Sequence, residues 1–215
     1  MYRHLLLLTL LAFLASCQNR TNESPSKYYE DGRARPTVAI VPAVDSTSFD
    51  YPWSLSEEFS NLLATNIAEK QSLYLPKEGM LKCDFSYDQD LFGTDLTWMK
   101  NSFYPYEFVV LVEFLKHDKI PLMKRNTPVY ELSSNLEMAV RVRIIDLRKT
   151  DPSIILQETI ADSYFFSKNL LPVDYQVSTW GTEEYTTSPL ATAHKQIAKE
   201  VVERINDYIL LAKSR

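Results

Sequence analysis

The chain has 215 residues, of which 45% are hydrophobic and 24% charged, and its formal net charge is −5 at pH 7. These values are typical of a globular protein and exclude a disordered or collagen-like chain. Its four glycines are too widely spaced for the loops that cradle phosphates in common nucleotide-binding motifs. Because lysines and arginines occur in nothing longer than short pairs, we expect no nucleic-acid partner.

The N-terminus has the order of features found in a bacterial lipoprotein signal. Arg3 precedes an apolar run over residues 5–14, which is too short for a membrane-spanning helix of about 20 residues but matches the central region of a signal peptide. The run ends in Leu14, Ala15, Ser16 and Cys17, which resemble the lipobox at which a cysteine is acylated. The alternatives are an ordinary secretory signal and a buried N-terminal helix. The pattern predicts a signal peptide over residues 1–16 and lipidation of Cys17.

Acylation would hold the body of the protein at a membrane, because each buried methylene contributes about 0.8 kcal/mol. Gln18 follows the cysteine, where lipoproteins retained at the inner membrane commonly carry Asp. By resemblance, Gln18 therefore favours an outer-membrane anchor with the body facing the periplasm, or a cell-membrane anchor if the host has one membrane. Cys83 would then be the lone thiol, and its apolar neighbours favour a buried position over a reactive one.

The first half of the body predicts a strand, a helix and a second strand. Residues 17–36 are polar and are expected to form a flexible tether, followed by a single globular domain over residues 37–215. A β-branched run at 37–42 predicts a buried strand, and apolar residues at helical spacing predict a helix capped by Ser54 or Ser56. A short strand at 72–76 would complete a right-handed crossover with parallel strands.

The second half predicts three stronger strands and a C-terminal helix. Residues 107–116 are apolar on both faces, which is typical of a central strand. Residues 136–144 and 154–166 flank a run of turn residues and are expected to form an antiparallel hairpin. A helix begins near Pro189, capped by Thr187 or Ser188. The predicted fold class is therefore α+β, with one mixed sheet of three to five strands packed by an early crossover helix and a C-terminal helix.

This order of elements resembles a group of bacterial periplasmic proteins. The similarity rests on the Val38–Pro42 strand, the Leu55–Phe59 helix start, the Tyr106–Val112 strand and the Leu136–Leu147 strand. The chain resembles penicillin-binding-protein activators and the periplasmic domain of the curli secretion channel, and more closely the predicted outer-membrane lipoproteins of chlamydiae. The resemblance implies a fold and a compartment, and it brings no catalytic residues with it.

Candidate sites are few, and we expect no metal and no cofactor. His117 beside Lys116 and Asp118 is interpreted as a solvated strand end, and His194 as a core histidine with satisfied hydrogen bonds. Aromatic side chains could form a surface for a protein partner, since Tyr and Trp give contact area at low entropic cost. The alternative is core packing. The candidates are Tyr164, Phe165, Phe166, Tyr175 and Trp180.

The sequence favours a noncatalytic, lipid-anchored binding or scaffolding protein with an envelope protein as its partner. Two alternatives remain open. The first is a subunit of an oligomeric secretion pore, to which residues 167–189 would contribute strands because residues 173–180 alternate as in a membrane β-strand. The second is an envelope hydrolase that uses acidic residues or a Cys–His pair.

Overall fold

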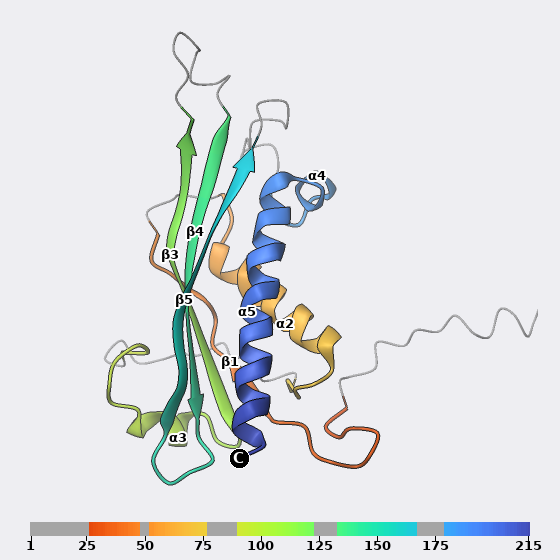
Figure 1. Cartoon of the computed structure of the whole chain (residues 1–215), viewed down its shortest axis with the longest axis vertical. Coiled ribbons are helices and arrows are strands. Elements are labelled where there is room, and N and C mark those ends of the chain that lie inside the picture. The colour runs from red at the N-terminus through yellow and green to blue at the C-terminus, as the bar shows by residue number, and fades with distance from the viewer. Residues whose placement is uncertain (1–25, 48–51, 77–89, 123–132, 167–178) are drawn as a thin grey trace, which may run out of the picture.

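The computed structural model describes residues 26–47, 52–76, 90–122, 133–166 and 179–215. The signal sequence, the lipobox with Cys17, Cys83 and Tyr175 lie outside the described residues. A twisted mixed sheet carries two long helices, α2 and α5, on one face and the short helix α3 near one end of the other face (Figure 1). The predicted α+β fold class is confirmed.

The sheet has five strands in the order β1-β3-β4-β5, with β2 also paired to β3. Both β1 and β2 are parallel to β3, whereas β3, β4 and β5 are antiparallel to their neighbours. The predicted central strand and the predicted hairpin are therefore confirmed. The bounds are β1 Val38–Ile40, β2 Val44–Asp45, β3 Phe108–Pro121, β4 Ser134–Asp146 and β5 Ser153–Phe166.

The period-2 alternation of β3 places its side chains in two separate cores. Phe108 and Val110 point toward α2 and α5 and belong to the larger core. Val109 and Leu111 point the other way and pack with Met99 on the far face of the sheet. Burial on both faces explains why this strand reads as continuously apolar.

Four described helices cover the sheet or flank it. α2 spans Leu55–Lys70 and α5 spans Pro189–Lys213, while α3 (Thr97–Ser102) and α4 (Glu183–Thr186) are short. Ser54 caps α2 by accepting from the Glu57 N–H, and Ser188 caps α5 by accepting from the Ala191 N–H. One alternative in each predicted pair of caps is thus confirmed. No helix among the described residues has the length and apolar character that crossing a bilayer requires.

Two segments differ from the sequence-based expectation. Residues 72–76 do not form a strand, because only Tyr74 pairs with Thr37 in a single parallel bridge and Pro76 lacks an N–H to extend the ladder. The alternative in which residues 167–189 contribute strands to a pore is not supported over residues 179–189, which form turns, the short helix α4 and the start of α5. The remainder of that segment, residues 167–178, lies outside the described residues.

Residues 26–36, which the sequence assigns to the tether, pack against the domain. A turn is closed by the hydrogen bond from Tyr29 N to Arg33 O at 2.9 Å. The Tyr29 hydroxyl donates to Ser72 O at 2.6 Å, and the Arg35 guanidinium lies 5.2 Å from the Tyr29 ring centroid. Segment 26–36 is therefore part of the folded domain, and it begins eleven residues before Thr37.

Candidate functional site

Five polar or aromatic side chains meet inside the larger core and form what we call the Glu58 cluster. They come from the start of α2, from β3, from α4 and from α5: Trp53, Glu58, His117, Tyr185 and His194. Glu58 is 1% exposed, and both imidazoles are 0% exposed. Such burial is tolerated only when the polar groups are hydrogen-bonded to one another.

Glu58 is the centre of the cluster because both of its oxygens accept hydrogen bonds. His194 Nδ1 lies 2.8 Å from Oε1, and the Trp53 indole N–H donates to Oε2 at 2.8 Å. The Tyr185 hydroxyl also donates to Oε1 and lies 3.0 Å from His194 Nδ1. His194 Nε2 in turn lies 2.8 Å from His117 Nε2. One chain of hydrogen bonds thus joins Glu58 of α2, His194 of α5 and His117 of β3.

The environment holds Glu58 as a carboxylate and His117 as a neutral ring. Burial tends to raise the pKa of Glu58, but the hydrogen bond and charge of His194, with the bonds from Tyr185 and Trp53, lower it overall. Burial, and secondarily the charge of His194, lowers the pKa of His117 to about 3. A protonated His194 would donate at both nitrogens, and a neutral one would accept at Nε2 from His117. In either state the Nε2–Nε2 pair has one donor and one acceptor.

The cluster has the residue types of a general base, but its geometry is that of a structural network. A Glu–His pair can orient an imidazole whose second nitrogen takes a proton from a substrate. Here that second nitrogen, His194 Nε2, faces His117 and not a cavity. Glu58, His117 and His194 are all sealed from solvent. The role that this geometry supports is to join α2, β3, α4 and α5 through hydrogen bonds. No group of three acidic, His or Cys residues in the described part of the chain could hold a metal ion.

Only part of this cluster could be anticipated. The core position predicted for His194 is confirmed. The prediction for His117 is wrong, because a β-bulge between Phe114 and Lys116 adds one residue and turns His117 to the core face. Glu58 carried only the signal of a first-turn carboxylate, although its position three residues after the buried Leu55 places it on the same helix face.

The candidate aromatic residues do not share one environment. Phe166 is buried in the larger core, and Tyr164 and Trp180 are partly buried against it. Phe165 points to the opposite face of β5 and is 59% exposed. Among the four candidates that the structure describes, Phe165 is therefore the one that offers a large apolar surface to a partner.

The described residues line surface depressions, of which a pair bears on the search for a site. One follows the outer face of α5 and is lined by charged and amide side chains: Gln196, Lys199, Glu200, Glu203, Arg204 and Asp207. The other, with a volume of about 410 Å³, lies between the β4–β5 turn and the C-terminal end of α5. We call the second one the end pocket. Neither opens onto the Glu58 cluster, because none of its lining residues belongs to that cluster.

Comparison with known proteins places the chain in a family. Residues 24–213 match DUF7499, described as a family of unknown function. The chain belongs to DUF7499. The match begins two residues before Ser26, where the described structure starts, so it includes the packed segment 26–36. No curated protein matches this DUF7499 chain.

Several solved structures are similar to this DUF7499 chain. The hypothetical protein CT253 from Chlamydia trachomatis is 23% identical over 82% of this chain and 98% of its own, with a TM-score of 0.64. The lipoprotein GNA1162 from Neisseria meningitidis is 10% identical over 80% and 99%, with a TM-score of 0.42. PelC from Paraburkholderia phytofirmans, solved as a dodecamer, is 10% identical over 78% and 85%, also with a TM-score of 0.42. The first of these shows a common fold with a chlamydial protein.

Proposed function

We propose that this chain is a noncatalytic binding module of the bacterial envelope, anchored to a membrane by acyl chains on Cys17. Its domain faces the periplasm, and Gln18 directs the anchor to the outer membrane. The lipobox and the short apolar run before it support this proposal. An envelope protein is its partner.

The observation that carries the noncatalytic part is the sealing of the Glu58 cluster. Its acid–base groups bind one another, and each imidazole is fully buried. A substrate would have to break this network and open the packing of α2 against α5 to reach a nitrogen. Enzymes place such groups at the wall of a cavity, whereas this chain places them between elements.

The anchor is tested by metabolic labelling with a fatty-acid analogue in the native host. Wild-type chain should incorporate the label and lose residues 1–16, whereas Cys17→Ala should remain unlabelled and accumulate as the longer precursor. Cys83→Ala is the matched control and should be labelled like the wild type. Labelling of Cys17→Ala at the wild-type level would overturn the anchor.

The noncatalytic role is tested in the same cells. Replacing the signal and Cys17 by a cleavable secretory signal gives a periplasmic chain without acyl groups. A binding module that works at the membrane should lose its function in this form, because its local concentration near the partner falls. Full complementation at native protein levels would support an enzyme acting on a diffusible substrate instead.

A further inference from the structure

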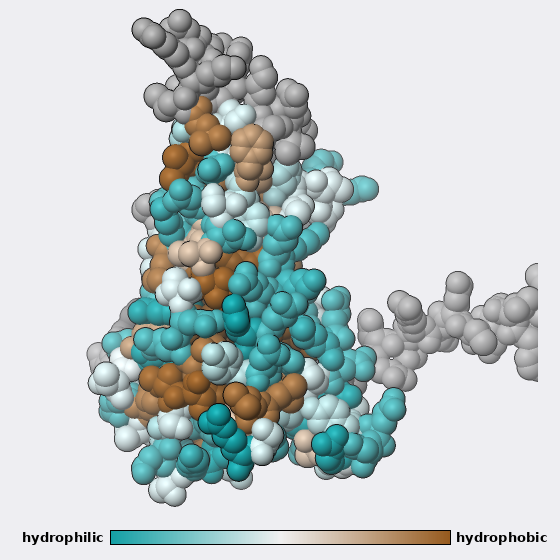
Figure 2. Space-filling view, viewed as in Figure 1, coloured by the Kyte–Doolittle hydropathy of each residue, from teal (hydrophilic) through white to brown (hydrophobic). Residues whose placement is uncertain are grey.

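The end pocket combines an apolar floor with a basic rim. Ile154 and Leu211 are 42% and 51% exposed beside it. Figure 2 shows hydrophobic surface gathered in a band near the lower end of the molecule, interrupted by strongly hydrophilic groups. The apolar lining residues are Ile154, Ile155, Leu211 and Ala212, joined by Tyr208, and the charged ones are Asp146, Arg148, Lys149 and Arg215.

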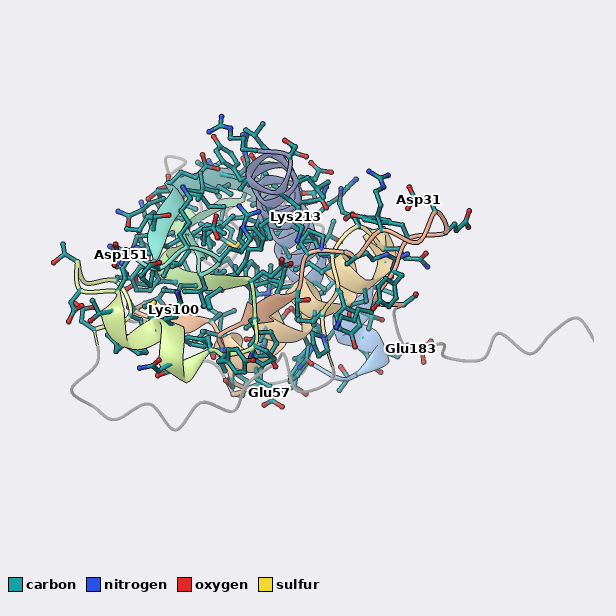
Figure 3. All side chains as sticks on the ribbon, turned by 90° about the horizontal axis from the view of Figure 1, so that it is seen from below. Asp31, Glu57, Lys100, Asp151, Glu183 and Lys213 are labelled. Carbon is teal, nitrogen blue, oxygen red and sulfur yellow. The ribbon has the colours of Figure 1, made fainter. Side chains whose placement is uncertain are left out.

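The rim has a positive surplus on a chain whose net charge is −5. Asp146 is matched by Arg148, whose Nε and Nη2 donate to its two oxygens at 3.0 and 2.7 Å. The charge of Lys149 also acts on Asp146, but the only salt bridge described at this carboxylate is the one from Arg148, and none of the described salt bridges involves Arg215. Two basic side chains at the pocket are thus available to an anion. Figure 3 looks onto this end of the molecule from below. It shows Asp151 of the β4–β5 turn at the outer edge, well away from Lys213 on α5.

The walls of the pocket are fixed before anything binds. Arg148 also donates to Ala212 O at 2.8 Å, which ties the β4–β5 turn to the end of α5. On the other side, Lys100 of α3 donates to Lys149 O at 2.5 Å and to Thr150 O at 3.1 Å. A preformed site loses less entropy on binding than one that must be ordered.

The described chain begins at this same end of the molecule. Segment 26–36, the β4–β5 turn and the C-terminus of α5 all lie at the lower end in Figure 1. Tyr29 bonds to Ser72, and Ser72 bonds to Asn206 of α5, two residues before Tyr208 of the pocket. Ser26 lies nine positions after Cys17, and nine residues span at most about 30 Å.

We propose that the end pocket is a membrane-docking surface that takes the headgroups of anionic phospholipids. The inference rests on the proposed acylation of Cys17, which would bring this end of the domain to the bilayer. Lys149 and Arg215 would bind lipid phosphates, and Ile154 and Leu211 would contact the apolar part of the interface. An anionic bilayer offers phosphates to the two basic side chains and an apolar layer to the floor of the pocket. The short segment between Cys17 and Ser26 would keep the pocket close to that bilayer.

The test uses the acylated full-length protein reconstituted in vesicles of phosphatidylcholine, with or without about one third phosphatidylglycerol. An amine-reactive reagent modifies lysines, and mass spectrometry reports the rate at each site. Lys149 should react about fivefold more slowly on the anionic vesicles, the factor expected for one basic side chain near an anionic surface. Lys199 is exposed on the outer face of α5 and should react at the same rate on both.

Two matched variants separate docking from an effect of charge alone. Leu211→Glu places a carboxylate in the pocket and should restore the Lys149 rate measured on neutral vesicles. Leu122→Glu adds the same charge at the far end of β3, where Leu122 is exposed, and should leave the protection of Lys149 intact. Both positions are exposed enough for the domain to stay folded.

The outcomes distinguish this inference from the proposed function. Acylated protein that shows equal Lys149 rates on the two kinds of vesicle would overturn the docking surface and leave the anchor standing. A chain that carries no acyl group would overturn both. Protection of Lys149 in cells but not on vesicles would identify an acidic protein as the occupant and would also overturn the lipid assignment.

Discussion

Glu58 is a carboxylate that the fold surrounds with hydrogen-bond donors from three other parts of the chain. His194, Tyr185 and Trp53 all bond to its oxygens. A buried ion that loses its partners costs about 3–5 kcal/mol, so each donor contributes to keeping the domain folded. The bonds from Tyr185 and His194 also fix how α2 and α5 meet over β3, because they join Glu58 to residues 127 and 136 positions away in sequence.

The Tyr185 hydroxyl can be removed without disturbing its ring. Tyr185→Phe should keep the edge contact with Trp53, whose ring centroid lies 5.3 Å away. It should lose about 1.5–3 kcal/mol of unfolding free energy, because a hydrogen bond to a charged group is lost. Urea denaturation measures the change. Tyr104→Phe is the control, since Tyr104 is 82% exposed, and equal stability of the two variants would contradict the bonded role of Tyr185.

His117 makes the stability of the domain depend on pH. Its pKa is about 3 in the folded protein and about 6.5 in an unfolded chain. The unfolded state therefore binds a proton that the folded state does not, and stability falls as the pH drops below 6.5. Between pH 6.5 and 5 the loss through this residue should be about 2 kcal/mol, at 1.36 kcal/mol per unit.

The control for this pH dependence is His117→Gln, whose amide can still bond to His194 but does not titrate. The unfolding free energies of wild type and variant are measured at pH 7 and at pH 5. The difference between the two proteins should be about 2 kcal/mol smaller at pH 5 than at pH 7. Glu58 acts in a separate range. The pKa of Glu58 is lower in the folded protein than in an unfolded chain. Glu58 therefore stabilises the fold at pH values above its unfolded pKa, and this contribution is lost as the pH falls through its folded pKa. Parallel curves for the two proteins would show that His117 titrates normally.

The secondary structure was predictable wherever one residue pattern ran without interruption. The alternation in residues 136–144 and the two-sided apolar run in 107–116 predict β4 and β3, because these patterns follow directly from the pleat of a strand. The β-bulge before Lys116 interrupts the pattern, and no local feature of the sequence marks it. One inserted residue reverses which face His117 occupies, so the cluster could not be assembled from periodicity.

Val110 tests the central position of β3. Its side chain is buried in the larger core and pairs across the sheet with both β1 and β4. Val110→Asp places an unpaired carboxylate there, which should cost several kcal/mol and unfold a domain of ordinary stability. Thermal unfolding followed by circular dichroism measures this. Ala161→Asp on the exposed face of β5 should change the melting temperature little, and a folded Val110→Asp would refute the packing described.

At the scale of the whole molecule, the sealed cluster and the end pocket occupy different parts of α5. His194 lies in the first turns of the helix, whereas Tyr208, Leu211 and Ala212 lie in its last turns beside the β4–β5 turn. The lipobox could be recognised from sequence because its residues are contiguous. The end pocket could not, since it joins residues 146–155 to residues 208–215 and exists only once β5 lies against α5.

The distance between anchor and domain should set how strongly the end pocket docks. Effective concentration falls roughly as the −3/2 power of linker length. Inserting 18 Gly/Ser residues between Cys17 and Ser26 triples the nine-residue spacing and should lower the docked-to-free ratio about fivefold. The measurement is the Lys149 modification rate on vesicles containing phosphatidylglycerol. The same insertion in Leu211→Glu should change nothing further, because that variant does not dock. A Lys149 rate unaffected by the insertion in the wild type would mean that the domain binds lipid independently of its anchor.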